Sequence, residues 1–297
     1  MRTFFSINGK SMVTNKRILV IGGAGFIGSN LVEHLVAHNS VVSIDNYSTG
    51  KKNNHVKGAE YRAGDAKDIA LIAKDDLFDI VFHLGEYSRV ESSLSEIDKV
   101  LAYNLYSIFP VVRYVKSIGA KLIYSGSSTK FGDNGANKHA SPYAWTKSTN
   151  TEFIKNFADW YGLNYAIVYF YNAYGNKEIS EGSYSTLVAK YINICSSGAE
   201  ALPVVTPGTQ LRNFTHVSDI VSALDLVAEK GSGDDFGIGS DQSYSVLDVV
   251  AMFGKKVEWL PERQGNRLTA ELKTEKTKAL GWSPSRSLKK YLQDNGF

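Results

Sequence analysis

Short apolar runs alternate with longer amphipathic stretches along the first 170 residues of the chain. The first run has the β-branched residues and the length of a strand buried on both faces, whereas the stretch that follows it carries apolar residues at helical spacing. The runs that we predict as strands are 18–21, 41–44, 61–65, 79–84, 121–125 and 164–170. This alternation indicates right-handed crossovers, and hence an α/β fold with a doubly wound parallel sheet.

The predicted helices follow the same alternation and then give way to less regular sequence. We predict helices over 26–37, 97–118, 143–161, 216–229 and 246–253, and a further short strand over 236–240. Between residues 171 and 210 the chain is rich in Tyr, Gly, Ser and Asn, and the alternation of strands and helices weakens. Such a composition is typical of a lobe assembled from loops and short elements.

The first predicted strand ends in a glycine-rich turn, G-G-A-G-F-I-G, over residues 22–28. Its glycines fit two spacings, one starting at Gly22 and one at Gly23, which share Gly25 and Gly28. In either register the backbone turns tightly and can approach a pyrophosphate without an intervening Cβ, while the N–H groups of the next helix face the phosphates. The turn therefore predicts a dinucleotide site, although a plain glycine-rich turn remains the alternative.

The second predicted strand ends in Asp45, where dinucleotide-binding α/β domains place the adenosine ribose. A carboxylate there accepts hydrogen bonds from the ribose hydroxyls and repels a 2′-phosphate. Residues 46–54 contain no arginine, although Lys51 and Lys52 could still meet a phosphate. We therefore predict NAD, and not NADP, as the cofactor of a Rossmann-type domain.

Two further strand ends are expected near this cofactor. Asp65 closes the third predicted strand, where it could meet the adenine amino group or cap a helix over 66–73, and one side chain could do both. The fourth strand ends at Leu84 and Gly85, which should lie beside the cofactor.

A tyrosine and a lysine, Tyr143 and Lys147, lie one helical turn apart in a predicted helix that follows a Ser-Pro start signal. The spacing alone carries little weight, because Y-x-x-x-K also occurs at Tyr47, within a glycine-containing loop. Ser127 follows the predicted strand 121–125 and should lie at the same edge of the sheet.

These three residues suggest a proton-transfer site. A free phenol is a poor base at neutral pH, but a nearby ammonium group and a positive nicotinamide ring favour the phenolate. Tyr143 would take a proton from a substrate hydroxyl as hydride passes to NAD, Ser127 would hydrogen-bond the same oxygen, and Lys147 would also hold the nicotinamide ribose. The alternative is that they are ordinary polar residues of a buried helix and strand.

Composition and charge exclude several other classes of function. The net charge of +3 leaves no electrostatic footprint for nucleic acid or an anionic membrane, and an apolar content of 43% supports a full core. The single cysteine, Cys195, excludes an intramolecular disulfide, and the first 16 residues are too polar for a signal peptide. We expect a cytoplasmic protein without a membrane span.

No metal site is predicted. His34 and His38 are spaced H-x-x-x-H without the acidic residue of a zinc-protease helix, so we expect them on a solvated helix face.

The elements divide into two predicted domains. We expect an NAD-binding Rossmann domain over 17–170, to which 211–240 returns, and a smaller C-terminal substrate lobe from 171–210 and 241–297. Residues 1–16 precede the first strand as an N-terminal extension without an assigned role.

The motifs together resemble the extended short-chain dehydrogenase/reductase family, and within it the nucleotide-sugar epimerases. The matching segments are G-G-A-G-F-I-G, D-N-Y-S-T-G, V-F-H-L, S-G-S-S-T-K-F-G, S-P-Y-A-W-T-K, Y-F-Y-N-A-Y-G, R-N-F-T-H-V-S-D and L-G-W-S-P. The NAD contacts predicted from the residues and from this resemblance are Gly22, Gly25, Phe26, Ile27, Gly28, Asp45, Asn46, Asp65, Leu84, Gly85, Asn104, Tyr143 and Lys147.

The resemblance also implies a substrate site. Ser127, Asn172, Arg212 and Arg263 would contact a nucleotide-diphosphate sugar, and the small side chain of Ala270 would leave room for an acetamido group. The implied activity is NAD-dependent epimerisation of a UDP-hexose or UDP-N-acetylhexosamine through a transient 4-keto sugar, in a homodimer. The alternatives are a nucleotide-4-keto-sugar reductase and a non-catalytic NAD-binding sensor.

Three features separate this chain from its relatives. Dehydratases and decarboxylases of the family carry a carboxylate just after the catalytic serine, where this chain has Ser128 and Thr129, and epimerases need none. Where the family usually has Ala-Ala after H-L, this chain has Gly85 and Glu86, which puts a carboxylate near the expected nicotinamide. Where relatives commonly have R-x-G-D, the motif here ends in Asn266.

Overall fold

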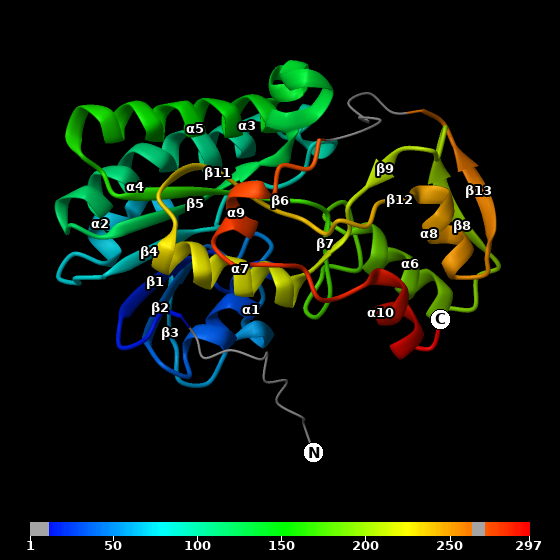
Figure 1. Cartoon of the computed structure of the whole chain (residues 1–297), viewed down its shortest axis with the longest axis horizontal. Helices are drawn as coiled ribbons and strands as arrows, with labels where there is room; N and C mark the ends of the chain where they lie inside the picture. The colour runs from blue at the N-terminus through cyan, green and yellow to red at the C-terminus, as the bar shows by residue number, and fades with distance from the viewer. Residues whose placement is uncertain (1–11, 263–270) are drawn as a thin grey trace.

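The computed structural model describes residues 12–262 and 271–297, with the backbone alone for 132–137. Its main feature is a seven-stranded parallel sheet in the order β3-β2-β1-β4-β5-β6-β11 (Figure 1). The strands are β1 (Arg17–Ile21), β2 (Ser40–Asp45), β3 (Glu60–Ala63), β4 (Ile80–His83), β5 (Lys121–Ser127), β6 (Tyr165–Phe170) and β11 (Gly233–Ile238). The predicted α/β fold with a doubly wound parallel sheet is confirmed.

Helices cover both faces of the sheet (Figure 1). One face packs on α1 (Phe26–Leu35) and α7 (Val217–Lys230), and the other on α2 (Ile69–Ile72), α4 (Tyr106–Ser117) and α5 (Pro142–Tyr161). The short helix α3 (Ile97–Val100) packs on α5. Successive strand residues point to opposite faces, so Val20 and Phe82 belong to the first core whereas Leu19 and Val81 belong to the second. Burial on both sides explains why the strand sequences are almost continuously apolar.

A second lobe is built from short elements beside the carboxyl ends of the strands (Figure 1). Its elements are β7 (Ala173–Tyr174), α6 (Leu187–Ser196), β8 (Ala201–Val205), β9 (Leu211–Arg212), β10 (Thr215–His216), β12 (Tyr244–Ser245), α8 (Val246–Met252), β13 (Lys256–Leu260) and α10 (Leu288–Asp294). The strands pair as β7 with β10, β8 with β13 and β9 with β12. Tyr191, Leu202 and Leu292 lie in a core of this lobe that is separate from those of the sheet.

After forming the first elements of this lobe, the chain returns to the large sheet. Strand β11 pairs with β6, and helix α9 (Glu275–Ala279) follows a segment that Tyr171 Oη anchors by donating to the Glu271 carbonyl at 2.8 Å. Trp282 is buried in the core under α1 and α7, where its Nε1 donates to the Asp219 carbonyl at 3.0 Å. Part of the predicted substrate segment 241–297 thus packs on the sheet, and the domain division itself stays a prediction.

The predicted helix over 97–118 is helical throughout, with one irregularity. A π-helical turn, Leu101–Leu105, separates α3 from α4, and α4 continues through Pro110 to Ser117. Asn104 lies in this turn and is fully buried. Wider turns of this kind often mark functional positions, because they redirect a side chain.

The expectation that His34 lies on a solvated helix face is wrong. Its Nε2 is 2.9 Å from the Asp225 carboxylate, because α7 packs against α1 at this point. The same carboxylate accepts hydrogen bonds from the backbone N–H groups of Met12 and Val13, and Val13 is fully buried. The end of the N-terminal extension therefore packs on the sheet domain.

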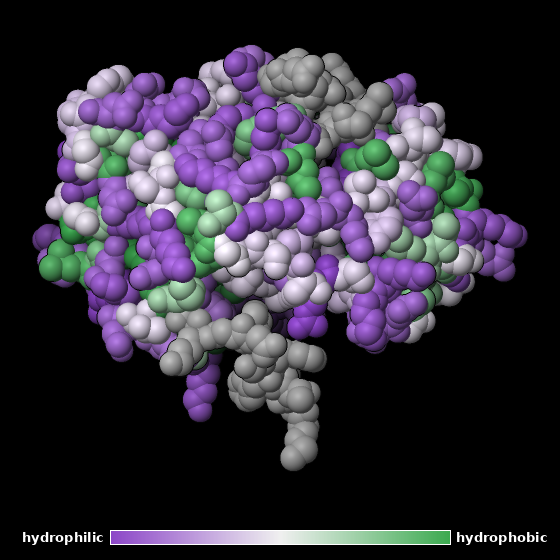
Figure 2. Space-filling view, in the orientation of Figure 1, coloured by the Kyte–Doolittle hydropathy of each residue, from purple (hydrophilic) through white to green (hydrophobic). Residues whose placement is uncertain are grey.

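The visible surface is mostly hydrophilic. In the view of Figure 2 apolar residues occur in small, separate groups between polar ones. Among the described helices, none is long and apolar enough to cross a membrane.

Candidate functional site

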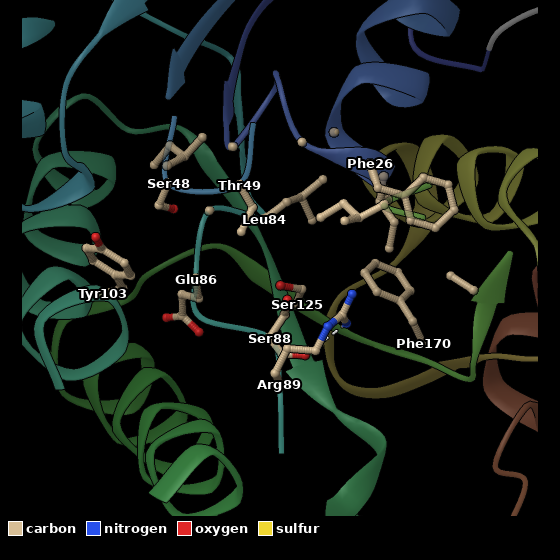
Figure 3. Close-up of a pocket in the computed structure, with 18 of the residues that line it drawn as sticks. Phe26, Ser48, Thr49, Leu84, Glu86, Ser88, Arg89, Tyr103, Ser125 and Phe170 are labelled. Carbon is tan, nitrogen blue, oxygen red and sulfur yellow. Dashed lines mark hydrogen bonds between the residues drawn. The ribbon is translucent and has the colours of Figure 1, made fainter. Parts of the chain in front are cut away.

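A pocket of about 420 Å³ lies at the carboxyl ends of the central strands, where the order of the sheet reverses between β1 and β4 (Figure 3). Ligands of doubly wound folds bind at this point, because the loops after neighbouring strands diverge there. The predicted residues that line the pocket are Gly22, Gly25, Phe26, Ile27, Gly28, Asp45, Asn46, Leu84, Gly85, Tyr143, Lys147 and Asn172. The structure therefore brings most of the predicted site residues together.

The glycine turn after β1 has the shape of a phosphate-binding loop. Gly22 has a φ of +85°, and a Cβ there would lie 2.7 Å from the Gly85 Cα, while a Cβ on Gly28 would lie 2.1 Å from the Gly22 carbonyl oxygen. Gly22, Gly25 and Gly28 line the pocket, whereas Gly23 packs against Ser43. The register that starts at Gly22 is the one that faces the pocket, and its bare backbone beside the start of α1 fits the phosphates of a dinucleotide.

Asp45 connects this turn to the end of β2. Its carboxylate is buried and accepts hydrogen bonds from the Ala24 N–H and the Tyr47 N–H, each at 2.8 Å. Each carboxylate oxygen has a further lone pair that can accept from another donor. Lys51 and Lys52, the two lysines that could meet a 2′-phosphate, are exposed and do not line the pocket.

Asp65 caps the short helical turn that follows β3. Its carboxylate accepts hydrogen bonds from the Lys67 N–H at 3.2 Å and from Asn46 Nδ2 at 3.3 Å. The capping interpretation is confirmed. The adenine contact stays a prediction, because the neighbours Gly64 and Ala66 line the pocket but Asp65 does not.

Tyr143 and Lys147 are held by the first turns of α5. Ser141 caps this helix by accepting a hydrogen bond from the Ala144 N–H at 3.1 Å, and a proline follows it at the first helical position. The Lys147 ammonium group is buried and lies 2.7 Å from both the Ser125 carbonyl oxygen and the Glu86 carboxylate. Ser125 and Glu86 lie at the pocket wall in Figure 3.

Ser127 and Asn104 do not line the pocket, although their chain neighbours Gly126 and Tyr103 do. Ser127 ends β5, and its hydroxyl oxygen accepts a hydrogen bond from Thr129 Oγ1 at 2.9 Å. Asn104 accepts from the Tyr87 N–H at 2.7 Å and donates to Thr146 Oγ1 at 3.0 Å, so it joins the loop after β4 to α5. The described pocket wall contains neither side chain, and their predicted contacts with substrate and cofactor stay predictions.

The predicted substrate residues are spread more widely. Asn172 lines the pocket in a left-handed conformation with a φ of 35°. Arg212 lies in β9, away from the pocket wall. Arg263 and Ala270 fall outside the described residues.

The structure also shows a pocket residue that we did not predict, Arg89. Its guanidinium group points into the pocket toward Ser125 and Phe170 (Figure 3). Its Nε donates to the Tyr184 carbonyl at 3.1 Å, and no carboxylate of the described chain lies within 4.0 Å of it. Desolvation lowers the pKa of Arg89 below its usual value, a sign of an incompletely compensated cation. Its place after a predicted strand end was the signal available in the sequence.

The other titratable pocket neighbours give no metal site. Within residues 12–262 and 271–297, no group of three or more His, Cys, Asp or Glu could hold a metal ion.

Comparison with known proteins places the chain in a family. The family model described as NAD dependent epimerase/dehydratase family matches residues 18–239. The UDP-glucose 4-epimerase of Thermotoga maritima, solved with UDP-glucose, superposes with a TM-score of 0.87 at 27% identity, covering 94% of this chain and 99% of that one. The UDP-N-acetylglucosamine 4-epimerase of Methanobrevibacter ruminantium superposes with a TM-score of 0.84 at 26% identity, covering 95% and 100%.

A relative of a different activity is equally similar in sequence. UDP-glucuronic acid decarboxylase 5 of Arabidopsis thaliana is 29% identical over 96% of this chain and 89% of its own length. The family model spans the glycine turn, Asp45, Tyr143 and Lys147, which line one pocket. The chain therefore belongs to the NAD-dependent epimerase/dehydratase family.

Proposed function

We propose that this protein is an epimerase that inverts C4 of a nucleotide-diphosphate sugar, most directly a UDP-hexose or UDP-N-acetylhexosamine. The observation that carries the proposal is the position of Tyr143 and Lys147, which line the same pocket as the glycine turn and Asp45. A proton acceptor and a dinucleotide cradle in one pocket suit reversible oxidation of a sugar hydroxyl. Two 4-epimerases of UDP-sugars that share the fold over more than nine-tenths of the chain support this activity.

The residues have distinct roles in this mechanism. Tyr143 removes the proton from the C4 hydroxyl, Ser127 donates a hydrogen bond to the same oxygen, and Lys147 favours the phenolate by its charge. NAD, held at the glycine turn and Asp45, would supply reversible hydride-acceptor chemistry for C4 of the sugar. Asp45 and the turn at Gly22 hold the dinucleotide.

The carboxylates of the pocket argue against elimination and decarboxylation. Dehydratases and decarboxylases of the resembling family use a carboxylate just after the catalytic serine. This chain has Ser128 and Thr129 at those positions. Among the residues that line the described pocket only Asp45 and Glu86 carry a carboxylate, and both are engaged, with backbone N–H groups and with Lys147 respectively. Epimerisation needs no further acid or base.

Arg89 supports a substrate that carries negative charge. Burial raises the pKa of the neighbouring Glu178 to about 7, so at neutral pH this carboxyl only partly offsets the guanidinium. A buried cation whose charge is only partly offset is stabilised by an anionic ligand, and the diphosphate group of a nucleotide sugar is such a ligand.

The function is tested with a panel of nucleotide sugars and the purified protein, followed by NMR without added cofactor. An epimerase returns its hydride, so bound NAD should support many turnovers without net NADH formation. Tyr143→Phe should keep the fold and NAD affinity and lower kcat by about 10²- to 10⁴-fold. Stoichiometric consumption of added NADH with a keto-sugar would instead establish the reductase, and near-native turnover in the variant would exclude Tyr143 as the base.

We expect Asp45 to select NAD over NADP. Asp45→Ala removes the carboxylate that repels a 2′-phosphate, and it should weaken NAD binding by about 10- to 100-fold. The difference between the affinities for NAD and NADP should therefore become smaller. Calorimetric titration with each cofactor measures the ratio of the two dissociation constants. Asp45→Asn keeps an acceptor oxygen for the glycine turn, so it distinguishes the effect of the lost charge from the effect of the lost side chain. Tighter binding of NADP to the unaltered protein would overturn the assignment.

We expect Arg89 to bind the anionic substrate. Arg89→Gln should raise KM for the nucleotide sugar by about 10- to 100-fold, since a charged hydrogen bond contributes about 1.5–3 kcal/mol. Lys256→Gln, which removes an exposed cation on β13, serves as the control and should leave KM unchanged. An unchanged KM in Arg89→Gln would restrict Arg89 to a structural role.

We also infer that the protein is a homodimer that buries the outer faces of α4 and α5. These helices expose Tyr106 (61%), Phe109 (49%), Trp145 (41%) and Trp160 (66%), more aromatic surface than a solvated face usually shows. Sedimentation analysis should give about twice the 32.7 kDa of one chain, and Phe109→Asp should shift the mass toward one chain. A monomer mass for the unaltered protein would contradict the inference.

A further inference from the structure

The side chain of Glu86, which stands where the resembling family usually has alanine, makes an ion pair with Lys147. Its carboxylate is fully buried, and Oε2 lies 2.7 Å from the Lys147 ammonium nitrogen. Tyr124 donates its hydroxyl to the same oxygen at 2.8 Å, and Asn150 Nδ2 donates to Oε1 at 3.0 Å. A buried carboxyl with three donors around it is built to carry a negative charge.

Neighbouring groups make Lys147 the charge partner of Glu86. His83 Nε2 is 3.5 Å from Oε1, but burial lowers the pKa of His83 to about 4, so the imidazole is neutral at physiological pH. Burial raises the pKa of Tyr124, which therefore stays a phenol and a donor. The opposing positive charge comes from the ammonium group of Lys147.

We propose that Glu86 is a positioning residue for the acid–base centre, which holds the Lys147 ammonium in place and offsets its charge at Tyr143. The proposal rests on the proposed function in so far as Tyr143 is the base. Glu86 acts through Lys147, since its own oxygens are occupied by Lys147, Tyr124 and Asn150.

The geometry assigns each N–H of the ammonium group. A lysine has three donors. One is directed at the Ser125 carbonyl at 2.7 Å and one at Glu86, which leaves one for the pocket. The two anchors, one in strand β5 and one in the loop after β4, restrict the rotamers of a side chain that otherwise has four flexible bonds, so the direction of the third N–H is restricted too.

The electrostatic consequence for Tyr143 has a definite sign. Lys147 follows Tyr143 by one turn on the same helix, and Arg89 from the loop after β4 and Tyr124 from β5 are electrostatic neighbours of Tyr143. Glu86 pairs with Lys147 and lies beside His83 of β4. The two cations favour the phenolate, Glu86 disfavours it, and the neutral His83 and Tyr124 contribute no charge. Removal of the Glu86 charge should therefore let the phenol ionise at lower pH.

The variant Glu86→Gln tests this, because it keeps the size and the acceptor oxygen but removes the charge. Ultraviolet titration of tyrosinate in the NAD-loaded protein, with the Tyr143→Phe signal subtracted in each background, isolates one phenol among the 17 tyrosines. We expect its midpoint to fall by about one pH unit. The low-pH limb of the kcat profile should move by the same amount, with KM for the nucleotide sugar nearly unchanged.

Two further variants complete the experiment. Glu152→Gln removes an exposed carboxylate that pairs with Lys155 on the same helix, and it should leave the midpoint in place. Glu86→Asp restores the charge and should return the midpoint toward that of the unaltered protein. If Glu86→Gln does not fold, Glu86→Ala, the residue common in the family, should show the same downward shift.

The titration needs no nucleotide sugar, so a failure of the proposed function and a failure of the proposal for Glu86 give different results. Absence of turnover on every nucleotide sugar would refute the proposed function and leave the titration to decide the role of Glu86. An unchanged midpoint in the folded Glu86→Gln or Glu86→Ala protein would overturn the proposal for Glu86, whatever the substrate.

Discussion

The site depends on a direct contact between two backbone segments. The turn after β1 and the loop after β4 meet at Gly22 and Gly85, so closely that a Cβ on Gly22 would lie 2.7 Å from the Gly85 Cα. Because neither segment has a side chain at this contact, the ends of the two central strands can lie next to each other. Glu86 and Arg89 follow within the same loop, and the contact therefore also determines where the charges of the pocket stand.

A second constraint is the compensation of buried charge. An ammonium group taken out of water without a counter-charge would cost several kcal/mol, and Glu86 offsets that cost for Lys147. Two asparagines hold the loop that carries Glu86 in place. Asn150 on α5 donates to the Glu86 carboxylate, and Asn104 accepts a hydrogen bond from the N–H of the next residue, Tyr87. Helix α5, the π-helical turn and the loop after β4 are thus joined by one polar network.

Local sequence patterns were sufficient for the fold and for the residues that end strands. Local patterns predicted all seven strands of the sheet in their order along the chain, and Asp45, Leu84, Gly85, Tyr143 and Lys147 do line one pocket. The partner of a side chain across the fold has no such local signal. Glu86 was visible as a departure from the resembling family, but its pairing with Lys147 was not, and neither were the pairing of His34 with Asp225 and the burial of Trp282 beneath α1 and α7.

The route of the chain has a mechanical consequence. After β6 the backbone enters the smaller lobe, returns as α7 and β11, enters the lobe again, packs Trp282 on the sheet and finishes as α10 in the lobe. Several segments of the backbone therefore cross between the lobe and the sheet. Displacement of the lobe relative to the sheet would therefore have to bend the backbone at several crossings at once.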